Sequence, residues 1–534
     1  MGPLWGRIAE SGKIEGENPS MASKPGRHRL PVEMGTTQPV HRHHWATGAA
    51  VVVYVDEPQR KVVELARHPV RLTLPLGFPP PYHAPVRVLL VSTYELGHQP
   101  WHLASPAARL LAEGHEVRCL DLAVEPWDHE RFAWAERVAF SVPMHTAMRL
   151  AMEASARLRS QRPEVPIAFY GLYGAIGFDA TVSQQSQHRL VGEYEDHLAA
   201  WAAGLSSLPL QLDLGNKEFL VPARQLLPPL ERYARLEIDG EQRLAGYVEA
   251  SHGCRHRCRH CPIPAVYDGR YRTTGLEQVV ADVAQLVEMG ARHVTFGDPD
   301  FLNAPRYAGD VLHEVSATFP QLTFDVTVKV EHIIDHSHLW GEWAERGVIF
   351  VVSAFESTND RILKLLDKGH TARGMARAVE VLTRVGIGLR PSWLPFTPWT
   401  EPGDLPEILT FLDEHDLLGS TDPVQLSIRL LIPEGSLLLR LPELAPYLGS
   451  YDPNALGYRW QGDESAERLQ RDLAALAEKG GDREQVMTAM WQRVMGQGTQ
   501  PMSSRRIAPR LTEDWFCCAE PTSGQLLVLG DQPR

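Results

Sequence analysis

Three cysteines stand within eight residues of one another in the middle of the chain, at Cys254, Cys258 and Cys261. Their thiolates are soft ligands that favour iron–sulfur or zinc sites. Three of them can bind three corners of a cubane 4Fe–4S cluster, and because no fourth cysteine lies nearby, one iron is left for a ligand that is not protein. A zinc knuckle is the alternative, but it normally has four ligands, and the nearby histidines do not stand at zinc-finger spacing.

The cysteines follow a predicted strand at 247–250 and precede a predicted helix at 276–289. This CxxxCxxC spacing, in that position, resembles the radical S-adenosylmethionine (SAM) superfamily. The resemblance implies an enzyme whose open iron binds the amino and carboxylate groups of SAM, so that one electron can break a C–S bond at the sulfonium. It also implies a reductase such as a flavodoxin or ferredoxin as the electron donor. Which C–S bond breaks stays open.

Polar residues at the ends of later predicted strands match places where relatives contact SAM. Asp298 or Asp300 would accept a hydrogen bond from the methionyl amine, although two carboxylates after a strand equally suit a helix cap. Glu356 and Ser357 resemble the position whose polar side chains meet the ribose or the amino acid portion. Arg390 is a candidate partner for the carboxylate, with an ordinary salt bridge as the alternative.

Alternating strands and helices from residue 247 onward predict a partial barrel of the (β/α)6 type, with chemistry at the carboxyl ends of its strands. The predicted strands are 247–250, 293–296, 324–328, 348–355, 387–394 and 424–430, and the predicted helices are 276–289, 306–319, 339–346, 372–385 and 404–415.

A second alternation precedes the cysteines and predicts a parallel, doubly wound sheet. Its predicted strands are 86–92, 117–122, 138–142 and 167–170, and its predicted helices are 105–113 and 147–159. A doubly wound domain ahead of a radical SAM barrel resembles the cobalamin-binding module found in part of the superfamily.

The cobalt-ligating DxHxxG motif of that module is absent from the first loop of the predicted sheet. His98 has Leu96 two residues before it, and Trp101 stands where the glycine would be. A degenerate module that has lost its corrin is favoured, and cobalamin is left open as a cofactor. A cobalamin-dependent methyltransferase or rearrangement enzyme is therefore the second functional hypothesis.

The sequence Cys517-Cys518-Ala519-Glu520-Pro521 near the C-terminus is the most unusual feature of the chain. It resembles the ending of the CUAEP/CCAEP-tail radical SAM proteins, some of which carry selenocysteine at the position of Cys518. The same group is similar to the radical SAM enzyme of arsinothricin biosynthesis. That similarity implies transfer of the 3-amino-3-carboxypropyl group of SAM to trivalent arsenic.

Adjacent cysteines cannot easily close a relaxed disulfide, but they can place two thiolates on one thiophilic atom. We therefore expect Cys517 and Cys518 to be catalytic and to hold a soft acceptor such as arsenite. Arsenite prefers three sulfurs, so Cys119 or a thiol cofactor would complete the set, or hydroxide would remain. Cys119 itself falls in a predicted strand, where it is most simply a small buried hydrophobe. A mobile tail with two incidental thiols is the alternative to a catalytic tail.

Together these patterns predict an α/β protein with five segments. They are a largely disordered extension (1–85), a Rossmann-like, cobalamin-binding-type domain (86–205), a linker (206–245), the radical SAM partial TIM barrel (246–431), and a mostly helical C-terminal region (432–534) with helices at 464–479 and 483–495 and an irregular tail.

Composition narrows the class of partner. The net charge is −13 and no dense Lys/Arg face occurs, which disfavours nucleic acid and favours a small-molecule or metalloid substrate. The absence of an apolar run long enough for a membrane span, and of a signal pattern, predicts a cytoplasmic protein. A noncatalytic metalloid or redox sensor that uses the tail as its receptor is the third functional hypothesis.

Overall fold

The computed structural model describes residues 84–176, 188–206, 210–216, 218–502 and 507–513, together with residues 521, 525, 526 and 529. All of these belong to one compact unit that begins at Pro80. Nearly all of the predicted N-terminal extension, and both tail cysteines, Cys517 and Cys518, lie outside the described residues.

The first sheet is parallel and doubly wound, and its four predicted strands are confirmed. Its order is β2-β1-β3-β4-β5-β6. The order reverses between β1 and β3, and ligands of such sheets bind in the crevice at that point. The pattern does not predict β5 or β6, and β6 lies in the segment that is expected to be a linker. The strands are β1 (Arg87–Ser92), β2 (Glu116–Asp121), β3 (Arg137–Ser141), β4 (Ile167–Tyr170), β5 (His188–Gly192) and β6 (Leu210–Asp213).

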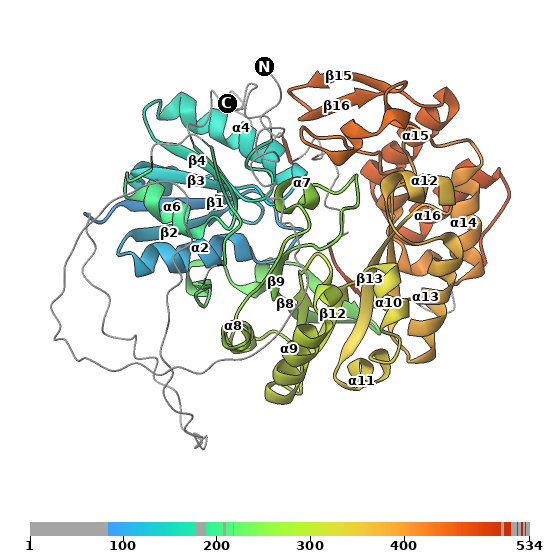
Figure 1. Cartoon of the computed structure of the whole chain (residues 1–534), viewed down its shortest axis with the longest axis horizontal. Helices are drawn as coiled ribbons and strands as arrows, with labels where there is room; N and C mark the ends of the chain where they lie inside the picture. The colour runs from blue at the N-terminus through green and yellow to red at the C-terminus, as the bar shows by residue number, and fades with distance from the viewer. Residues whose placement is uncertain are drawn as a thin grey trace, which may run out of the picture. The chain divides into compact units, whose positions relative to one another are not determined.

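Helices cover both faces of this sheet because alternate residues of each strand point to opposite faces. Leu89 and Val91 of β1 pack into a core with α3 and α4, whereas Val88 and Leu90 pack into a second core with α2 and α6. Figure 1 shows α4 on one side of the sheet and α2 on the other. The helices are α2 (Trp101–Ala112), α3 (His129–Trp134), α4 (His145–Gln161) and α6 (Glu195–Ala202).

The second sheet is a curled half-barrel in the order β14-β13-β12-β11-β8-β7-β17. The strands from β8 to β14 are parallel, whereas β7 and β17 extend the sheet antiparallel at one edge. The strands are β7 (Arg235–Ile238), β8 (Glu241–Val248), β11 (His293–Phe296), β12 (Thr323–Thr327), β13 (Val348–Glu356), β14 (Gly388–Trp393) and β17 (Arg510–Leu511).

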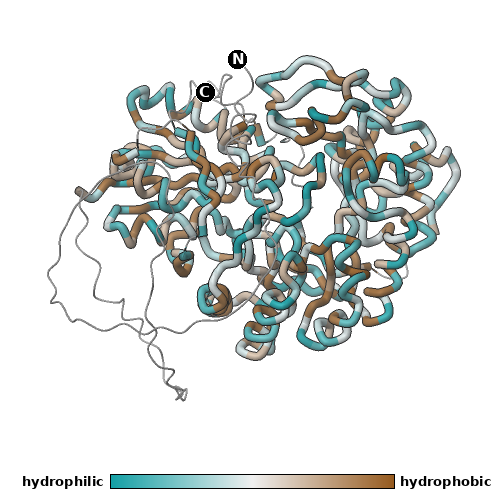
Figure 2. The backbone as a smooth tube through the Cα atoms, in the orientation of Figure 1, coloured by the Kyte–Doolittle hydropathy of each residue, from teal (hydrophilic) through white to brown (hydrophobic). Residues whose placement is uncertain are grey.

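Amphipathic helices pack on the outer face of the half-barrel. In α8, for example, Val279, Val283 and Leu286 lie on one stripe and are buried in the main core. Figure 2 shows hydrophobic residues along the strands and hydrophilic ones on the outward sides of these helices. The helices are α8 (Leu276–Glu288), α9 (Pro305–Thr318), α10 (Val330–Asp335), α11 (Trp340–Glu345), α12 (Asp360–Leu366), α13 (Ala372–Arg384) and α14 (Asp404–Glu414).

The predicted sixth barrel strand at 424–430 is wrong. Most of it is the 3-10 helix η5 (Pro423–Ser427), and only one bridge, between Phe396 and Arg429, continues the sheet. Two features explain the difference. Pro423, directly before the predicted strand, has no backbone N–H to donate. The side-chain oxygen of Gln425 accepts the hydrogen bond from the backbone N–H of Trp393 at 3.0 Å. A side chain thus satisfies part of the edge of β14 that a strand would have paired.

The C-terminal region contains the two predicted helices, α15 (Glu464–Lys479) and α16 (Arg483–Met495). It also contains an unpredicted hairpin of β15 (Leu448–Asp452) and β16 (Gly457–Trp460). Among the described residues, no helix is both long enough and apolar enough to cross a membrane.

Candidate active site

The cysteine loop begins directly after β9 (Ser251–Gly253), a short strand that follows β8. The loop leads into α7 (Ile263–Tyr267), and the chain then returns as β10 (Tyr271–Thr273), which pairs antiparallel with β9. Gly253 has a φ of +74°, and a Cβ there would collide with the carbonyl oxygen of Arg270. Glycine is therefore required at the turn immediately before Cys254.

The loop is fixed to the barrel by hydrogen bonds from its own backbone. The N–H of Arg259 donates to Leu366 O at 2.8 Å, at the end of α12. The side-chain oxygen of Asn303 accepts from the N–H of Arg255 at 3.1 Å and lies 3.7 Å from Cys254 Sγ. These contacts anchor the cysteine loop to the barrel.

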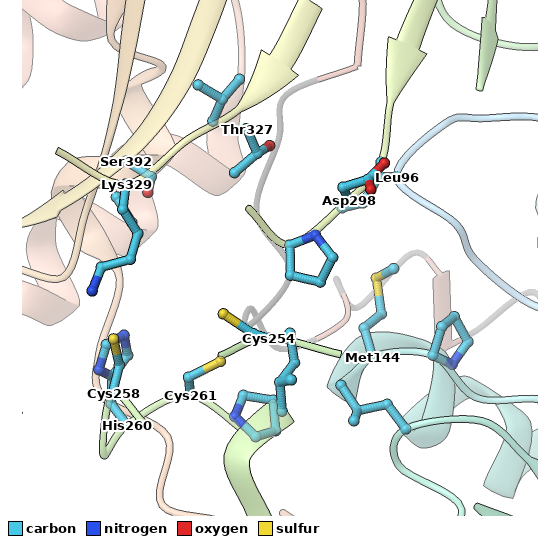
Figure 3. A pocket seen from close by; sticks show the side chains of 18 of the residues that line it. Leu96, Met144, Cys254, Cys258, His260, Cys261, Asp298, Thr327, Lys329 and Ser392 are labelled. Atoms are coloured by element: carbon cyan, nitrogen blue, oxygen red, sulfur yellow. The ribbon is translucent and has the colours of Figure 1, made fainter. Parts of the chain in front are cut away.

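The three cysteines line a cavity of about 420 Å³. Cys254 and Cys258 are buried and Cys261 is partly buried. Figure 3 shows the three side chains together, with Lys329 and Met144 on either side. Further cavity residues come from the barrel (Asp298, Thr327, Lys329, Glu356, Lys368, Arg390, Ser392, Trp393) and from the first sheet (Leu96, His98, His102, Met144, Tyr194).

Glu356 lies at a β-bulge at the end of β13, with a φ of +67°. Its Oε1 accepts hydrogen bonds from Lys368 Nζ and His260 Nε2, both at 3.1 Å. Burial by itself raises the pKa of Glu356, but the charges of Lys368 and His260 outweigh it and hold the pKa at about 2. Glu356 is therefore an ionised carboxylate tied to the cysteine loop.

The two aspartates after β11 have different environments. Asp298 lines the cavity, and its carboxylate accepts from the N–H of Ala250 at 3.0 Å and from the hydroxyl of Ser251. Burial raises the pKa of Asp298 to about 7, although these hydrogen bonds oppose the shift. Asp300 is completely buried and caps the 3-10 helix η3 (Phe301–Asn303) by accepting from the N–H of Leu302.

Asp300 also holds two histidines beside the cysteine loop. Its Oδ2 lies 2.7 Å from His332 Nδ1 and 3.6 Å from His256 Nε2. The three side chains are close enough to share one metal ion. However, Lys329 Nζ lies 3.0 Å from His256 Nδ1, and an ammonium at that distance opposes a second cation. The arrangement is better explained as an electrostatic support, in which the buried Asp300 carboxylate pairs with His332 and with His256 of the cysteine loop.

Arg390 and Ser357 complete the set of predicted SAM contacts. Arg390 is buried, and its Nη2 donates to Asp422 Oδ1 at 2.7 Å, while its Nη1 finds no hydrogen-bond partner among the described residues. Its guanidinium therefore retains a donor at the cavity wall. The hydroxyl of Ser357 instead accepts from the N–H of Asn359 at 3.1 Å, at the start of α12.

The loop after β1 is bound to the barrel. The His98 ring packs against Tyr247 of β8 at 4.6 Å between centroids, and burial lowers the pKa of His98 to about 4. The side-chain oxygen of Gln99 accepts from Arg224 Nη1 at 2.8 Å, and Arg224 forms a completely buried pair with Asp282. The switch-point loop of the first sheet is thus packed into the barrel wall.

A chain of alternating acids and histidines continues this junction. His102 lies 3.1 Å from Glu95 and 3.4 Å from Glu249, and His252 lies 3.2 Å from Glu249 and 2.9 Å from Glu193. Burial by itself lowers the pKa of His102, but Glu249 and Glu95 outweigh it and raise the pKa to about 9. The first sheet and the barrel are therefore joined by buried charges on the sheet side of the cavity.

Residues 248–393, which include all three cysteines, match the sequence model of the Radical SAM superfamily. The chain carries a radical SAM domain. Among curated proteins, this domain is similar to ribosomal protein uS12 methylthiotransferase RimO of Chlorobium phaeobacteroides, at 24% identity over 183 residues, 32% of this chain and 42% of the relative. It is also similar to the tRNA-2-methylthio-N(6)-dimethylallyladenosine synthase of Pseudoalteromonas translucida, at 24% identity over 31% of this chain and 36% of the relative.

The chain thus spans less than half the length of these relatives. The domain and its enzyme relatives indicate an enzyme, which favours catalysis over a noncatalytic sensor. Among solved structures, the fold is similar to the cobalamin-dependent SAM radical enzyme OxsB. The apo form gives a TM-score of 0.57 at 15% identity, with 74% of this chain and 66% of that chain covered. The predicted fold class, a doubly wound sheet followed by a radical SAM half-barrel, is confirmed.

A radical SAM domain implies a 4Fe–4S cluster and SAM. The donor set fits the cluster, because three thiols on one fixed loop line a cavity that also contains the cations Lys329 and Lys368. A corrin fits less well. The β1 loop that would supply its lower ligand is packed against Tyr247 and hydrogen-bonded to Arg224.

Sequence patterns do not single out several residues of this site. Lys368 follows Asp367 and precedes Gly369, both with positive φ, and the Asp-Lys-Gly sequence signals a turn without indicating what the lysine contacts. His102 and Glu249 lie 147 residues apart in the chain, so no local pattern could have paired them.

Proposed function

We propose that the protein is a radical SAM enzyme that transfers a SAM-derived group to a small molecule held between the barrel and the first sheet. The observation that supports it most is the cavity itself. The three cysteines of the radical SAM domain line it together with side chains from both sheets. SAM would occupy the cysteine side and the acceptor the sheet side. When bound, the cluster supplies the electron that breaks a C–S bond of SAM.

The chain's own residues would orient SAM. Arg390 offers its unpaired Nη1 to the carboxylate, a charge-assisted hydrogen bond of the strong kind. Asp298 would accept from the amine, and the positive charge of the amine would favour its ionised form. Glu356 is engaged by Lys368 and His260 through Oε1, which leaves Oε2 for a polar contact with the nucleoside.

For the acceptor we propose a soft atom held by Cys517 and Cys518, with arsenite as the named candidate and the 3-amino-3-carboxypropyl group as the group transferred. The described chain up to Glu513 supports this. Leu511 and Glu513 line the cavity, and the hydroxyl of Tyr94 donates to Glu513 Oε1 at 3.0 Å. Cys517 follows Glu513 by four positions, and four residue-to-residue steps span at most about 14 Å. The two thiols would therefore be tethered within reach of the cavity.

A third sulfur for arsenite would have to come from elsewhere. Cys119 is buried in the core between β1, β2 and α2, and burial raises the pKa of its thiol. A buried thiol of this kind is unreactive. This agrees with the prediction that Cys119 is a small buried hydrophobe. We therefore propose that a thiol cofactor or a retained hydroxide supplies the third ligand of the arsenic.

The Cys517→Ser/Cys518→Ser double variant tests the tail. We expect unchanged iron and sulfide content and unchanged SAM binding, but loss of the arsenic-containing product by mass spectrometry. Cys119→Ser is the matched control, because its thiol is buried away from the cavity, and it should retain product formation. Product at the wild-type level in the double variant would refute the role of the tail. Separating 5′-deoxyadenosine from methylthioadenosine in the same assay identifies the bond that breaks.

A cobalamin-dependent methyltransferase or rearrangement enzyme is the second candidate, favoured by the fold similarity to OxsB. The packed β1 loop weighs against it. The absorption spectrum of the full-length protein after incubation with hydroxocobalamin and gel filtration decides between the two. We expect no retained corrin, and stoichiometric corrin would favour the second candidate.

A further inference from the structure

A buried lysine lies beside the cysteine loop. Lys368 is 3% exposed and lines the same cavity as Cys258 and Cys261. Its Nζ lies 3.1 Å from Glu356 Oε1, which also accepts from His260, the residue immediately before Cys261. The ammonium therefore shares its carboxylate partner with a histidine of the cysteine loop.

The backbone fixes this lysine relative to the cysteines. Helix α12 ends at Leu366, and the left-handed residues Asp367 (φ +57°) and Gly369 (φ +79°) turn the chain inward on both sides of Lys368. The carbonyl of Leu366 accepts the hydrogen bond from the N–H of Arg259. The same turn thus carries the lysine and anchors the cysteine loop.

Burying an ammonium costs several kcal/mol unless negative groups surround it. The Glu356 carboxylate meets this need, because its Oε1 lies 3.1 Å from Lys368 Nζ and both side chains are buried. Glu356 neutralises the ammonium only in part at other positions in the cavity. Because the surroundings have a low dielectric constant, the positive charge is weakly screened there and acts on a neighbouring cluster.

We infer that the positive charge of Lys368 raises the reduction potential of the cluster held by Cys254, Cys258 and Cys261. This inference rests on the proposed function. Reduction adds one electron, supplied by the reductase, and makes the cluster more negative by one unit, whereas Lys368 keeps its proton throughout. A fixed positive charge nearby stabilises the reduced state more than the oxidised state. Glu356 has the opposite effect on the potential and also holds the ammonium in place.

A purely structural clamp is the competing explanation of the Lys368–Glu356 pair. A clamp would change stability or cluster content when either partner is replaced, and any change in potential would have the same sign for both. A charge effect predicts opposite signs.

The test is an anaerobic titration with dithionite and mediators, without SAM, followed by EPR of the reduced cluster. We expect Lys368→Met to lower the midpoint potential and Glu356→Gln, which keeps an oxygen acceptor, to raise it. Lys364→Met is the matched control, because Lys364 lies on the exposed side of α12, and it should leave the potential unchanged.

Equal potentials in all variants, or shifts of one sign for both partners, would overturn the inference. If Lys368→Met assembles no cluster, the sign of the Glu356→Gln shift decides: an upward shift supports the inference, and no shift or a downward shift overturns it. Iron and sulfide analysis of the wild-type protein comes first. A wild-type protein without a cluster would refute the proposed function itself, whereas a cluster with unshifted variants refutes only the role of Lys368.

Discussion

Strand β14 places two buried donors at the cavity wall that have no hydrogen-bond partner among the described residues. They are Arg390 Nη1 and the indole N–H of Trp393. Leaving a buried donor unpaired costs about 1–3 kcal/mol. At the scale of single residues, the cavity is therefore shaped for a ligand that presents oxygen acceptors to β14.

Replacing Arg390 tests this directly. We expect Arg390→Gln to weaken SAM binding by about tenfold or more, because a hydrogen bond to a charged group contributes about 1.5–3 kcal/mol. Arg483 still pairs with Asp422 at 2.6 Å, so the fold should remain. Equilibrium dialysis of SAM against the reconstituted protein measures the change. Arg384→Gln, at an exposed position of α13, serves as the control, and equal affinities would contradict the assignment.

Local spacing predicts the three cysteines because their ligand geometry is contained in one loop. Asp298 and Arg390 could be proposed from their positions near strand ends. Lys368 could not, because it reaches Glu356 only through the turn after α12 and the bulge in β13. The structure also separates Asp298, at the cavity, from Asp300, at a helix cap, a distinction that sequence spacing leaves open.

At the scale of elements, the β9–β10 pair and the turn at Gly253 set the start of the cysteine loop. We expect Gly253→Ala to reduce cluster content severely while the helical far-ultraviolet circular dichroism remains. The added Cβ would collide with the carbonyl oxygen of Arg270 and the ring of Tyr267, both between the cysteines and β10, and not with the helices of the barrel. Gly309→Ala is the control. Gly309 lies in α9 with open space around it, and the change should stabilise the protein by about 0.5–1 kcal/mol. Normal cluster content in Gly253→Ala would contradict the expectation.

Most strands could be predicted because buried parallel strands are continuous apolar runs. The exceptions have physical reasons. The run at 424–430 contains Gln425, whose side chain takes over a backbone hydrogen bond of β14. β5 carries Arg189, which is completely buried and stacks over the ring of Phe169 at 4.6 Å. The arginine interrupts the apolar run in the sequence, so the strand could not be predicted from it.

At the scale of the whole molecule, buried charges join the first sheet to the barrel. Folding raises the pKa of His102 from 6.5 to about 9. The folded protein therefore binds this proton more tightly than the unfolded chain. The resulting stability, on the order of 3 kcal/mol, is present in full below pH 6.5 and is lost as the pH rises through about 9.

We expect the urea midpoint of the wild-type protein to fall between pH 6.5 and 9.5. His102→Gln should start lower at pH 6.5 and change less with pH, because it has no proton to lose at this position. Lys364→Met, far from the junction in the sequence and exposed, should follow the wild-type profile. A His102→Gln profile parallel to that of the wild-type protein would show that the junction does not depend on this charge.

The pairing of β17 with β7 bears on how tightly the tail thiols would need to bind the proposed acceptor. Arg510 and Leu511 pair with the edge of the barrel, and Cys517 follows Leu511 by only six positions. Short tethers generally give the groups they carry a local concentration in the millimolar range. Under the proposed role of the tail, thiols of modest intrinsic affinity would therefore retain the acceptor, whereas the same thiols on a detached peptide would lose it to competing thiols in solution.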